Sequence, residues 1–303
     1  MENILLIFIC LLLGVALQRV KAFPTQGYKA FNQFIIYISL PALALYYIPK
    51  IALNSSLFYP LAVAWIGFLF SYLFFSILGK RLGWPRRLTG CLIIVAGLGN
   101  TSFVGFPIIQ ALYGEEGLKS AIIVDQPGSF VVMATLGIIT ATVYSGSKPD
   151  IREISFKIIS FPPFVAFVLA ALFNIMQLDF PNIFQLVFQK LGNTVTPIAL
   201  VSVGLQLKID FKSKHWRLLS LGLFFKLFLT PLLFFILYRI VFGATGIPID
   251  VSIMEAAMAP MITGAILASN FGLKPKLSSM MIGIGIPVSF LSLLFWHWML
   301  SVA

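Results

Sequence analysis

Apolar runs long enough to cross a membrane recur along the whole sequence, and they constrain the fold more than any other feature. A transmembrane helix needs about 20 mostly apolar residues, because the hydrocarbon core of a bilayer is about 30 Å thick. Such runs occupy residues 3–19, 31–48, 57–79, 88–113, 117–145, 154–176, 183–207, 215–242, 251–272 and 277–300. We therefore expect an all-α integral membrane protein with ten transmembrane helices.

The composition excludes a soluble globular domain. Hydrophobic residues make up 59% of the chain and charged residues 10%, whereas a soluble domain is about half apolar and about a quarter charged. The first run lacks the basic start and the small-residue cleavage site of a secretory signal, so we interpret it as a helix. Cys10 and Cys91 both lie inside apolar runs, which favours packing over a disulfide or metal pair.

The net charge of +11 follows the predicted membrane topology. Basic residues gather in the connections after the first, third, fifth, seventh and ninth runs, whereas the other connections hold only Lys50, Lys119 and Arg239. The gathered residues are Arg19, Lys21, Lys29, Lys80, Arg81, Arg86, Arg87, Lys148, Arg152, Lys157, Lys208, Lys212, Lys214, Arg217, Lys274 and Lys276. The positive-inside rule puts these connections in the cytoplasm and both termini outside it. The sequence predicts a multi-pass plasma (inner) membrane protein and no nucleic-acid partner.

A hydrophilic linker, SGSKPDIREIS at 145–155, divides the runs into two equal halves. Because each half holds an odd number of helices, the halves enter the membrane from opposite sides. We predict two inverted repeats of five helices, at 1–147 and 153–303.

Weak internal similarity supports the inverted repeat. YISLPALAL at 37–45 resembles NTVTPIALV at 193–201, with Pro41 over Pro197. GFPIIQALYG at 105–114 resembles TGAILASNFG at 263–272. The two matches occur in the same order and at nearly the same separation, which chance explains less easily than either match alone.

Two of the apolar runs contain residues that break helices. VAGLGNTSFVGFPIIQALYG at 95–114 holds glycines, an amide, hydroxyls and a proline, and AAMAPMITG at 256–264 is a second break around Pro260. Irregular backbone at membrane depth is tolerated only where protein buries it or where it lines a wet cavity. Paired breaks in two inverted halves indicate a transporter's substrate site. The alternative is that Gly and Pro merely kink or closely pack the helices.

LGNTSFVGFP at 98–107 and AAMAPM at 256–261, with the ten-helix plan, resemble the auxin efflux carrier family, whose bacterial members include proposed malate and malonate permeases. The resemblance covers essentially the whole chain. The absence of a long hydrophilic central loop is typical of the short prokaryotic form. The resemblance implies the fold of the bile-acid and sodium–proton transporter superfamily, in which the fourth and ninth transmembrane helices cross. In this sequence they are the runs at 88–113 and 251–272.

That fold has a fixed scaffold and a moving transport domain. The resemblance implies a scaffold at about 1–50 and 154–207 and a transport domain at about 57–145 and 215–303. Transport would then follow an elevator mechanism, and two copies would pair through their scaffold helices.

The resemblance also carries over single residues. Pro260 matches the family's crossover proline in helix 9, and Asn100 matches its helix 4 asparagine. Ser102 stands where the first-half partner of Pro260 would fall, so the first-half crossover is atypical. Gln126 matches a helix 5 glutamine near the family's substrate site.

Electrostatics favours an anionic substrate. A half-helix that begins after a break presents unsatisfied N–H groups and the positive end of a helix dipole. Two such starts, near Thr101 and Met261, would hold a carboxylate without a buried arginine. The candidate substrate-binding residues are Asn100, Thr101, Ser102, Gln126, Pro260, Met261, Thr263, Pro41 and Pro197. The glycines expected to allow the backbone geometry of the crossing are Gly97, Gly99 and Gly264.

Polar residues of the seventh run, at 183–207, have two interpretations. Asn193, Thr194 and Thr196, with Pro41 and Pro197, would bend helices 2 and 7 where they face the substrate cavity. Simple hydrogen bonding between helices is the alternative. Neither reading makes a sodium site of helix 7, because that helix belongs to the scaffold in this plan.

Ionisable residues inside the runs bear on ion coupling, because charges at this depth mark pathways, proton relays or ion pairs. Asp125 is the main candidate for a proton carrier or cation ligand, and a structural ion pair with Lys226 is the alternative. Glu255 is the second candidate, with an interfacial position as its alternative. Lys190 has a stem long enough to reach the outer surface and is left unassigned. We rank proton coupling or potential-driven movement above sodium coupling.

The sequence holds no motif of an enzyme such as His-Glu-x-x-His, Gly-x-Ser-x-Gly or a Walker loop. We expect no enzymatic activity, cofactor or metal. The interpretation is a secondary carrier for a carboxylate such as malate, malonate or an auxin-like acid. The rival is a membrane receptor that binds a carboxylate without moving it.

Overall fold

The computed structural model describes residues 2–24, 26–52, 54–146, 152, 156, 159–207 and 215–302. The predicted boundary between the two repeats, at 147 and 153, lies outside these residues, and so do the basic residues of the predicted cytoplasmic connections Lys148, Lys157, Lys208, Lys212 and Lys214. The described chain is helical, apart from connections and one isolated antiparallel bridge. The all-α fold class is confirmed.

The described part of the first half of the chain contains seven α-helices and the short helices that join them. The α-helices are α1 (Glu2–Leu17), α2 (Gly27–Phe34), α3 (Leu40–Tyr47), α4 (Phe58–Arg81), α5 (Arg86–Gly97), α6 (Phe106–Ile123) and α7 (Ile138–Ser145). The joining π-helices are η1 (Ile35–Ser39), η4 (Thr101–Gly105), η5 (Val124–Phe130) and η6 (Met133–Gly137). The 3₁₀-helices are η2 (Ile48–Lys50) and η3 (Ser55–Leu57).

In the second half, α-helices are again joined by π-helices. Its α-helices are α9 (Pro162–Ile175), α10 (Asn182–Gly192), α11 (Val195–Gln206), α12 (Trp216–Phe224), α13 (Thr230–Phe235), α14 (Ile247–Ala256), α15 (Ile262–Asn270) and α16 (Pro275–Val302). Its π-helices are η7 (Phe225–Leu229) and η8 (Ile236–Val241).

Six helical segments of the described chain are long and apolar enough to cross a membrane. They are Gly27–Lys50, Ser55–Arg81, Thr101–Ser145, Asn182–Gln206, Trp216–Val241 and Pro275–Val302. Leu5–Leu17 and Pro162–Ile175 are apolar but shorter. The protein is therefore a multi-helix membrane protein, and the arrangement as ten spans in two inverted repeats stays a prediction.

One connection is very short. The runs at 88–113 and 117–145 were expected to be separate helices, and the two helical parts of α6 meet at Gly114, whose backbone is not helical. Gly114 has a φ of 64°, which a residue without a Cβ adopts at little cost. One glycine therefore turns the chain, and a longer loop is not needed.

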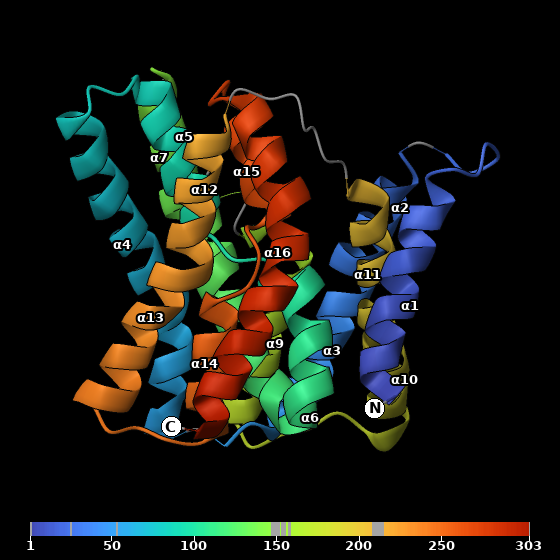
Figure 1. Ribbon diagram of the computed structural model, residues 1–303. Coiled ribbons are helices and arrows are strands. Elements are labelled where there is room, and N and C mark those ends of the chain that lie inside the picture. The colour runs from blue at the N-terminus through green and yellow to red at the C-terminus, as the bar shows by residue number, and fades with distance from the viewer. Residues whose placement is uncertain are drawn as a thin grey trace.

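The helices form two groups by their contacts. In the first, α1, α2 and α10 pack with α3, α9 and α11; we call it the scaffold group. In the second, α4 to α7 pack with α12 to α16; we call it the crossing group. In Figure 1, α1, α2, α10 and α11 stand together at the right of the molecule, and α4, α5, α7, α12 and α13 stand at the left.

A close glycine contact holds α1 against α11 within the scaffold group. A Cβ on Gly14 would lie 2.3 Å from the carbonyl oxygen of Val201 and 2.8 Å from Cα of Gly204. Small residues let two helices approach in a membrane, where van der Waals packing drives association. The scaffold group is thus built by backbone contact. Its role as a fixed scaffold stays a prediction.

Both ends of the chain lie at the same end of the molecule. Figure 1 shows the start of α1 and the end of α16 at the bottom. The connections from α1 to α2, from α4 to α5 and from α15 to α16 lie at the top. The basic residues Arg81, Arg86 and Lys274 border these upper connections. Positive charge therefore gathers at the end opposite to the termini.

Candidate functional site

Two interrupted helices meet in the crossing group. After α5 the chain is extended and resumes as η4 and α6, and after α14 it is extended and resumes as α15. Asn100 donates its backbone N–H to the carbonyl of Ala259 at 2.7 Å, and Met261 donates its own to the carbonyl of Leu98 at 3.0 Å. The two extended stretches thus satisfy each other's backbone groups, which water cannot reach at membrane depth. The helices are interrupted within the segments that the sequence predicts.

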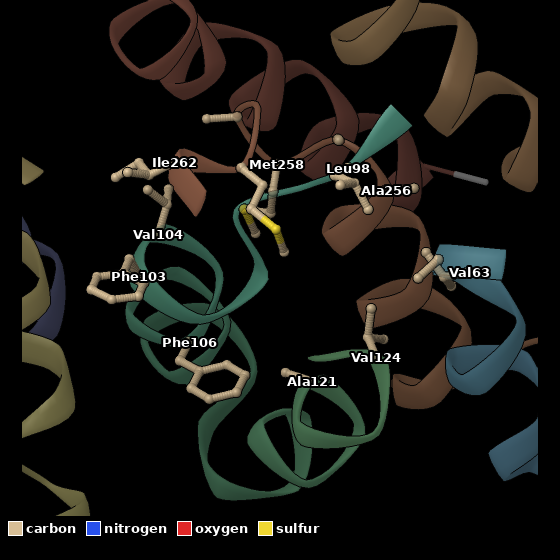
Figure 2. Close-up of a cluster of buried hydrophobic side chains, with 14 of the residues drawn as sticks. Val63, Leu98, Phe103, Val104, Phe106, Ala121, Val124, Ala256, Met258 and Ile262 are labelled. Atoms are coloured by element: carbon tan, nitrogen blue, oxygen red, sulfur yellow. The ribbon is translucent and has the colours of Figure 1, made fainter. Parts of the chain in front are cut away.

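The bridge at the centre of the crossing joins Gly99 to Pro260 in antiparallel fashion. Buried apolar side chains surround it. Figure 2 shows Leu98 and Val104 from the first interrupted segment close to Met258 and other residues of the second. The irregular backbone is therefore enclosed in protein, as its survival in a membrane requires.

The glycines at the crossing, Gly97, Gly99 and Gly264, let neighbouring atoms pack close to the backbone. A Cβ on Gly99 would lie 3.1 Å from Nζ of Lys226, and a Cβ on Gly97 or Gly264 would have neighbours at 3.0 Å or 3.2 Å. The glycines with positive φ lie elsewhere in the described chain. Close packing, and not an unusual φ, is therefore the reason for these glycines.

Asp125 is bound by the start of the second half of the first interrupted helix. The hydroxyls of Thr101 and Ser102 each donate to Oδ1 of Asp125 at 2.6 Å. The amide of Gln126 donates to Oδ2 of Asp125 at 3.3 Å. Asp125 is only 5% exposed. The structure thus brings the predicted coupling residue together with three predicted substrate-binding residues.

The alternative of an ion pair between Asp125 and Lys226 is wrong. Lys226 donates instead from Nζ to the backbone carbonyl of Ala256 at 2.9 Å. Among the residues that the structure describes, no salt bridge joins Lys226 to a carboxylate. Lys226 and Glu255 line the same small cavity. The helices α13 and η8 lie between Lys226 and Glu255 in the sequence, so the sequence alone did not show that these two residues are neighbours.

Glu255 lies at the crossing, so its alternative interfacial position is wrong. Its side chain is 1% exposed, and within the described chain both carboxyl oxygens lack a hydrogen-bond partner. Oε2 stands 2.5 Å from the point that a Cβ on Gly105 would occupy. Leaving a buried polar group unsatisfied costs about 1–3 kcal/mol, and more for a charge. An unpartnered carboxyl group therefore marks a place for a proton, a cation or a ligand.

Asn100 combines a structural bond with an unused donor. Its Oδ1 accepts the N–H of Phe103 at 3.2 Å and caps η4. Its Nδ2 has no partner in the described chain, and neither has Oε1 of Gln126. Both side chains are at most 2% exposed. These two amides therefore retain unused hydrogen-bonding atoms beside the crossing.

The second half-helix start offers less than the sequence predicts. The N–H of Met261 is already bonded to Leu98, so it is not available to an anion in this arrangement. Thr263, the second residue of α15, is half-buried. The polar side chains near the crossing come from both halves of the chain.

A small cavity lies behind the crossing, inside the crossing group. Its volume is about 10 Å³, close to the minimum of about 10–15 Å³ that one water molecule needs. Polar side chains of Thr101, Ser129, Thr230, Lys226 and Glu255 line it. It has room for one water or one bare ion and none for a carboxylate substrate.

The opposite face of the first interrupted helix contacts the scaffold group. α11 packs against η4 and α6, and Oγ1 of Thr196 donates to Oε1 of Gln110 at 2.9 Å. Pro197 is the next residue of α11 and so belongs to the helix that meets the crossing group. Pro41 lies in α3, which packs on α9 and α10.

Helix-to-helix hydrogen bonds account for part of the polar cluster in the seventh run. The hydroxyls of Ser39 and Thr194 lie 2.7 Å apart and link η1 to the start of α11. Asn193 is exposed between α10 and α11, and Lys190 is exposed on α10. The structural alternative for Thr194 is therefore confirmed.

Sequence reasoning missed Gly105, Ser129 and Thr230. Ser129 follows Asp125, and Thr230 follows Lys226, by the spacing that puts two side chains on one face of a helix. That spacing is a signal that could have found both hydroxyls. Gly105 gave no signal, because its contact with Glu255 joins distant parts of the chain.

Comparison with known proteins agrees with a transporter. Residues 1–297 match the family described as membrane transport protein. An uncharacterized transporter of Methanothermobacter thermautotrophicus is 25% identical, and the alignment covers 97% of this chain and 96% of the length of that transporter. An uncharacterized transporter of Methanocaldococcus jannaschii is 26% identical over 99% of this chain and 98% of its own. The uncharacterized transporter YfdV of Escherichia coli is 22% identical over 94% of this chain and 92% of its own.

The match spans both interrupted helices and both helix groups, and the fold is that of a multi-pass membrane protein. This chain therefore belongs to the membrane transport protein family, the auxin efflux carrier family that its broken-helix motifs resemble.

Proposed function

We propose that this protein is a secondary transporter that carries a small organic anion across the cytoplasmic membrane by elevator-type alternating access. The observation that carries the proposal is the pairing of two interrupted helices beside buried amide atoms without partners, Nδ2 of Asn100 and Oε1 of Gln126. Nδ2 of Asn100 is a donor that suits a carboxylate oxygen, and Oε1 of Gln126 is an acceptor that suits a hydroxyl or a protonated carboxyl group of the substrate. A monocarboxylate or small dicarboxylate such as malate, malonate or an auxin-like acid is the substrate class.

The substrate would bind between η4 and the scaffold group. Ser102 is half-buried there, and α11 covers η4. Because the cavity behind the crossing holds about 10 Å³, a carboxylate needs space that opens only when η4 and α11 separate. The hydrogen bond from Thr196 to Gln110 must then break once in each cycle. Sliding of the crossing group along the scaffold group supplies this opening.

Proton coupling would run through Asp125. When ionised, its carboxylate accepts the hydroxyls of Thr101 and Ser102. When protonated, it has an O–H to donate and fewer acceptor sites. The hydroxyls that border the substrate would reorient between the two states. This link supports proton coupling or potential-driven movement over sodium coupling, with Glu255 as the second group that exchanges a charge.

The orientation follows the basic end of the molecule. The helix ends that carry Arg81, Arg86 and Lys274 would face the cytoplasm, by the positive-inside rule. Both termini would face outward. Two copies would pair through the scaffold group, as in the family that the sequence resembles.

Uptake into proteoliposomes tests the function. Radiolabelled malate, malonate and indole-3-acetate are offered in turn under imposed pH, voltage and sodium gradients. Saturable uptake of one acid supports the carrier. Specific binding of an acid without uptake under any gradient supports the second candidate, a membrane receptor built on the same buried amides.

A further inference from the structure

Lys226 sits where the two interrupted helices touch. Its side chain is 2% exposed, and Nζ donates to the carbonyl of Ala256 at 2.9 Å. Ala256 ends α14, and the last carbonyls of a helix carry the negative end of its dipole. Gly99, on the other interrupted segment, would bring a Cβ to 3.1 Å from the same Nζ. The ammonium group therefore binds one segment of the crossing and lies beside the other.

Oxygen-bearing side chains line the cavity beside this ammonium group. The cavity that Lys226 lines is also lined by Thr101, Ser129 and Thr230, which carry hydroxyls, and by Glu255. The Glu255 carboxylate is unpartnered and 1% exposed. Carboxylate, hydroxyl and helix-end carbonyl oxygens are ligands that a hard cation such as Na⁺ accepts. The place has the chemistry of a cation site and already holds a positive charge.

The ammonium group leaves little room for a second cation. The cavity is about 10 Å³, so an added Na⁺ would stand close to the Lys226 ammonium group, and two like charges in one buried site are costly. Without Lys226, the carboxylate of Glu255 would have no cation beside it.

We propose that the Lys226 ammonium group is a built-in cation that takes the place of an alkali ion at the crossing and binds its two segments together. The protein then needs no sodium ion to form the crossing. Removal of the side chain leaves both a hole and an unpaired carboxylate, so Na⁺ or Li⁺ should bind there. The consequence for coupling rests on the proposed function, whereas the cation site itself does not.

Thermal unfolding of the purified full-length protein tests this proposal without any substrate. The wild type, Lys226→Ala, Lys226→Gln and the exposed-lysine control Lys190→Ala are compared in NaCl, LiCl, KCl and choline chloride at equal ionic strength and at neutral pH. We expect Na⁺ or Li⁺ to raise the Tm of Lys226→Ala by several degrees over choline. The wild type and Lys190→Ala should show no such difference.

A second substitution identifies the ligand. Adding Glu255→Gln to Lys226→Ala should abolish the sodium-dependent rise in Tm, and binding of radioactive sodium should be detectable only in the variant that retains Glu255. Equal stabilisation of the wild type by Na⁺ would overturn the proposal. So would a folded Lys226→Ala that ignores every cation, or failure of both Lys226 variants to fold in sodium, because Na⁺ should replace the ammonium group.

The result is independent of transport. If no carboxylate is taken up by proteoliposomes, the proposed function fails while the sodium-dependent stability of Lys226→Ala still stands. If uptake succeeds and the variant ignores sodium, the built-in cation fails alone.

Discussion

The carboxylate of Glu255 lies against the backbone of Gly105, with Oε2 2.5 Å from the point where a Cβ would stand. Both residues are buried, and they belong to the two different interrupted helices. A methyl group on residue 105 would also meet Oε1 at 2.7 Å and Cδ at 2.9 Å. The Glu255 carboxyl group can occupy this position only because residue 105 has no methyl group.

Gly105→Ala should therefore displace Glu255 and impair uptake of the transported acid at least about tenfold, equivalent to about 1.4 kcal/mol. Overpacking typically costs about 1–3 kcal/mol, so the protein should remain folded with a lower Tm. The matched control is Gly137→Ala, whose new Cβ would be in ordinary contact at 3.5 Å. Uptake by Gly105→Ala equal to that of the control would mean that the position of Glu255 does not matter for transport.

Asn100 is predicted to act through its free Nδ2 and not only through its cap. Asn100→Ala removes both functions, and loss of a cap alone costs about 1 kcal/mol. Asn100→Asp keeps an oxygen that accepts the N–H of Phe103 and removes the donor. Uptake per folded molecule should fall strongly in both variants. Tm should fall in both as well, in Asn100→Ala because the cap is lost and in Asn100→Asp because a charge is buried. Asn193→Ala, an exposed asparagine in the scaffold group, is the control.

Retention of normal uptake by Asn100→Asp would remove Nδ2 from the substrate site. Normal uptake per folded molecule in both variants would assign Asn100 to the structure of η4 instead.

Asp125→Asn should abolish the response of uptake to a pH gradient. The amide keeps an oxygen for the hydroxyls of Thr101 and Ser102, but it cannot gain or lose a proton. The measurement is initial uptake rate with and without an inward proton gradient at constant voltage. Asp179→Asn, at an exposed position, should behave as the wild type. An unchanged response in Asp125→Asn would make Asp125 a structural residue.

Thr196→Val should loosen the contact between the two helix groups. The lost hydrogen bond to Gln110 is worth about 1 kcal/mol, which shifts an equilibrium about fivefold toward separation. Labelling of a cysteine at position 102, introduced as Ser102→Cys, by a polar thiol reagent should rise by that factor. Thr194→Val is the control, because its bond lies within the scaffold group. Equal labelling in both backgrounds would mean that the two helix groups do not separate there.

The helix breaks could be predicted because their causes are local. Glycine and proline lower helix stability wherever they stand, and in an apolar run the broken backbone must find a partner. The sequence also indicated that Asp125, Gln126 and Asn100 belong to one site, and the structure brings Asp125 and Gln126 into contact with each other.

The partners of the buried charges could not be predicted, because they depend on tertiary packing. An ion pair of Lys226 with Asp125 was left open as an alternative, and Lys226 binds the end of α14 instead. A position at the membrane interface was left open for Glu255, and Glu255 is buried at the crossing. In each case a contact between helices far apart in sequence decides the outcome, and no local pattern encodes it.

The measurement that tests the central claim most directly is uptake of radiolabelled malate, malonate and indole-3-acetate by wild-type proteoliposomes, compared with Asn100→Asp and with empty liposomes. We predict saturable uptake of at least one acid that responds to a pH or voltage gradient, ignores sodium and is lost in Asn100→Asp. Specific binding of the acid with no uptake under any gradient would contradict transport. Uptake that requires sodium in the wild type would contradict the coupling.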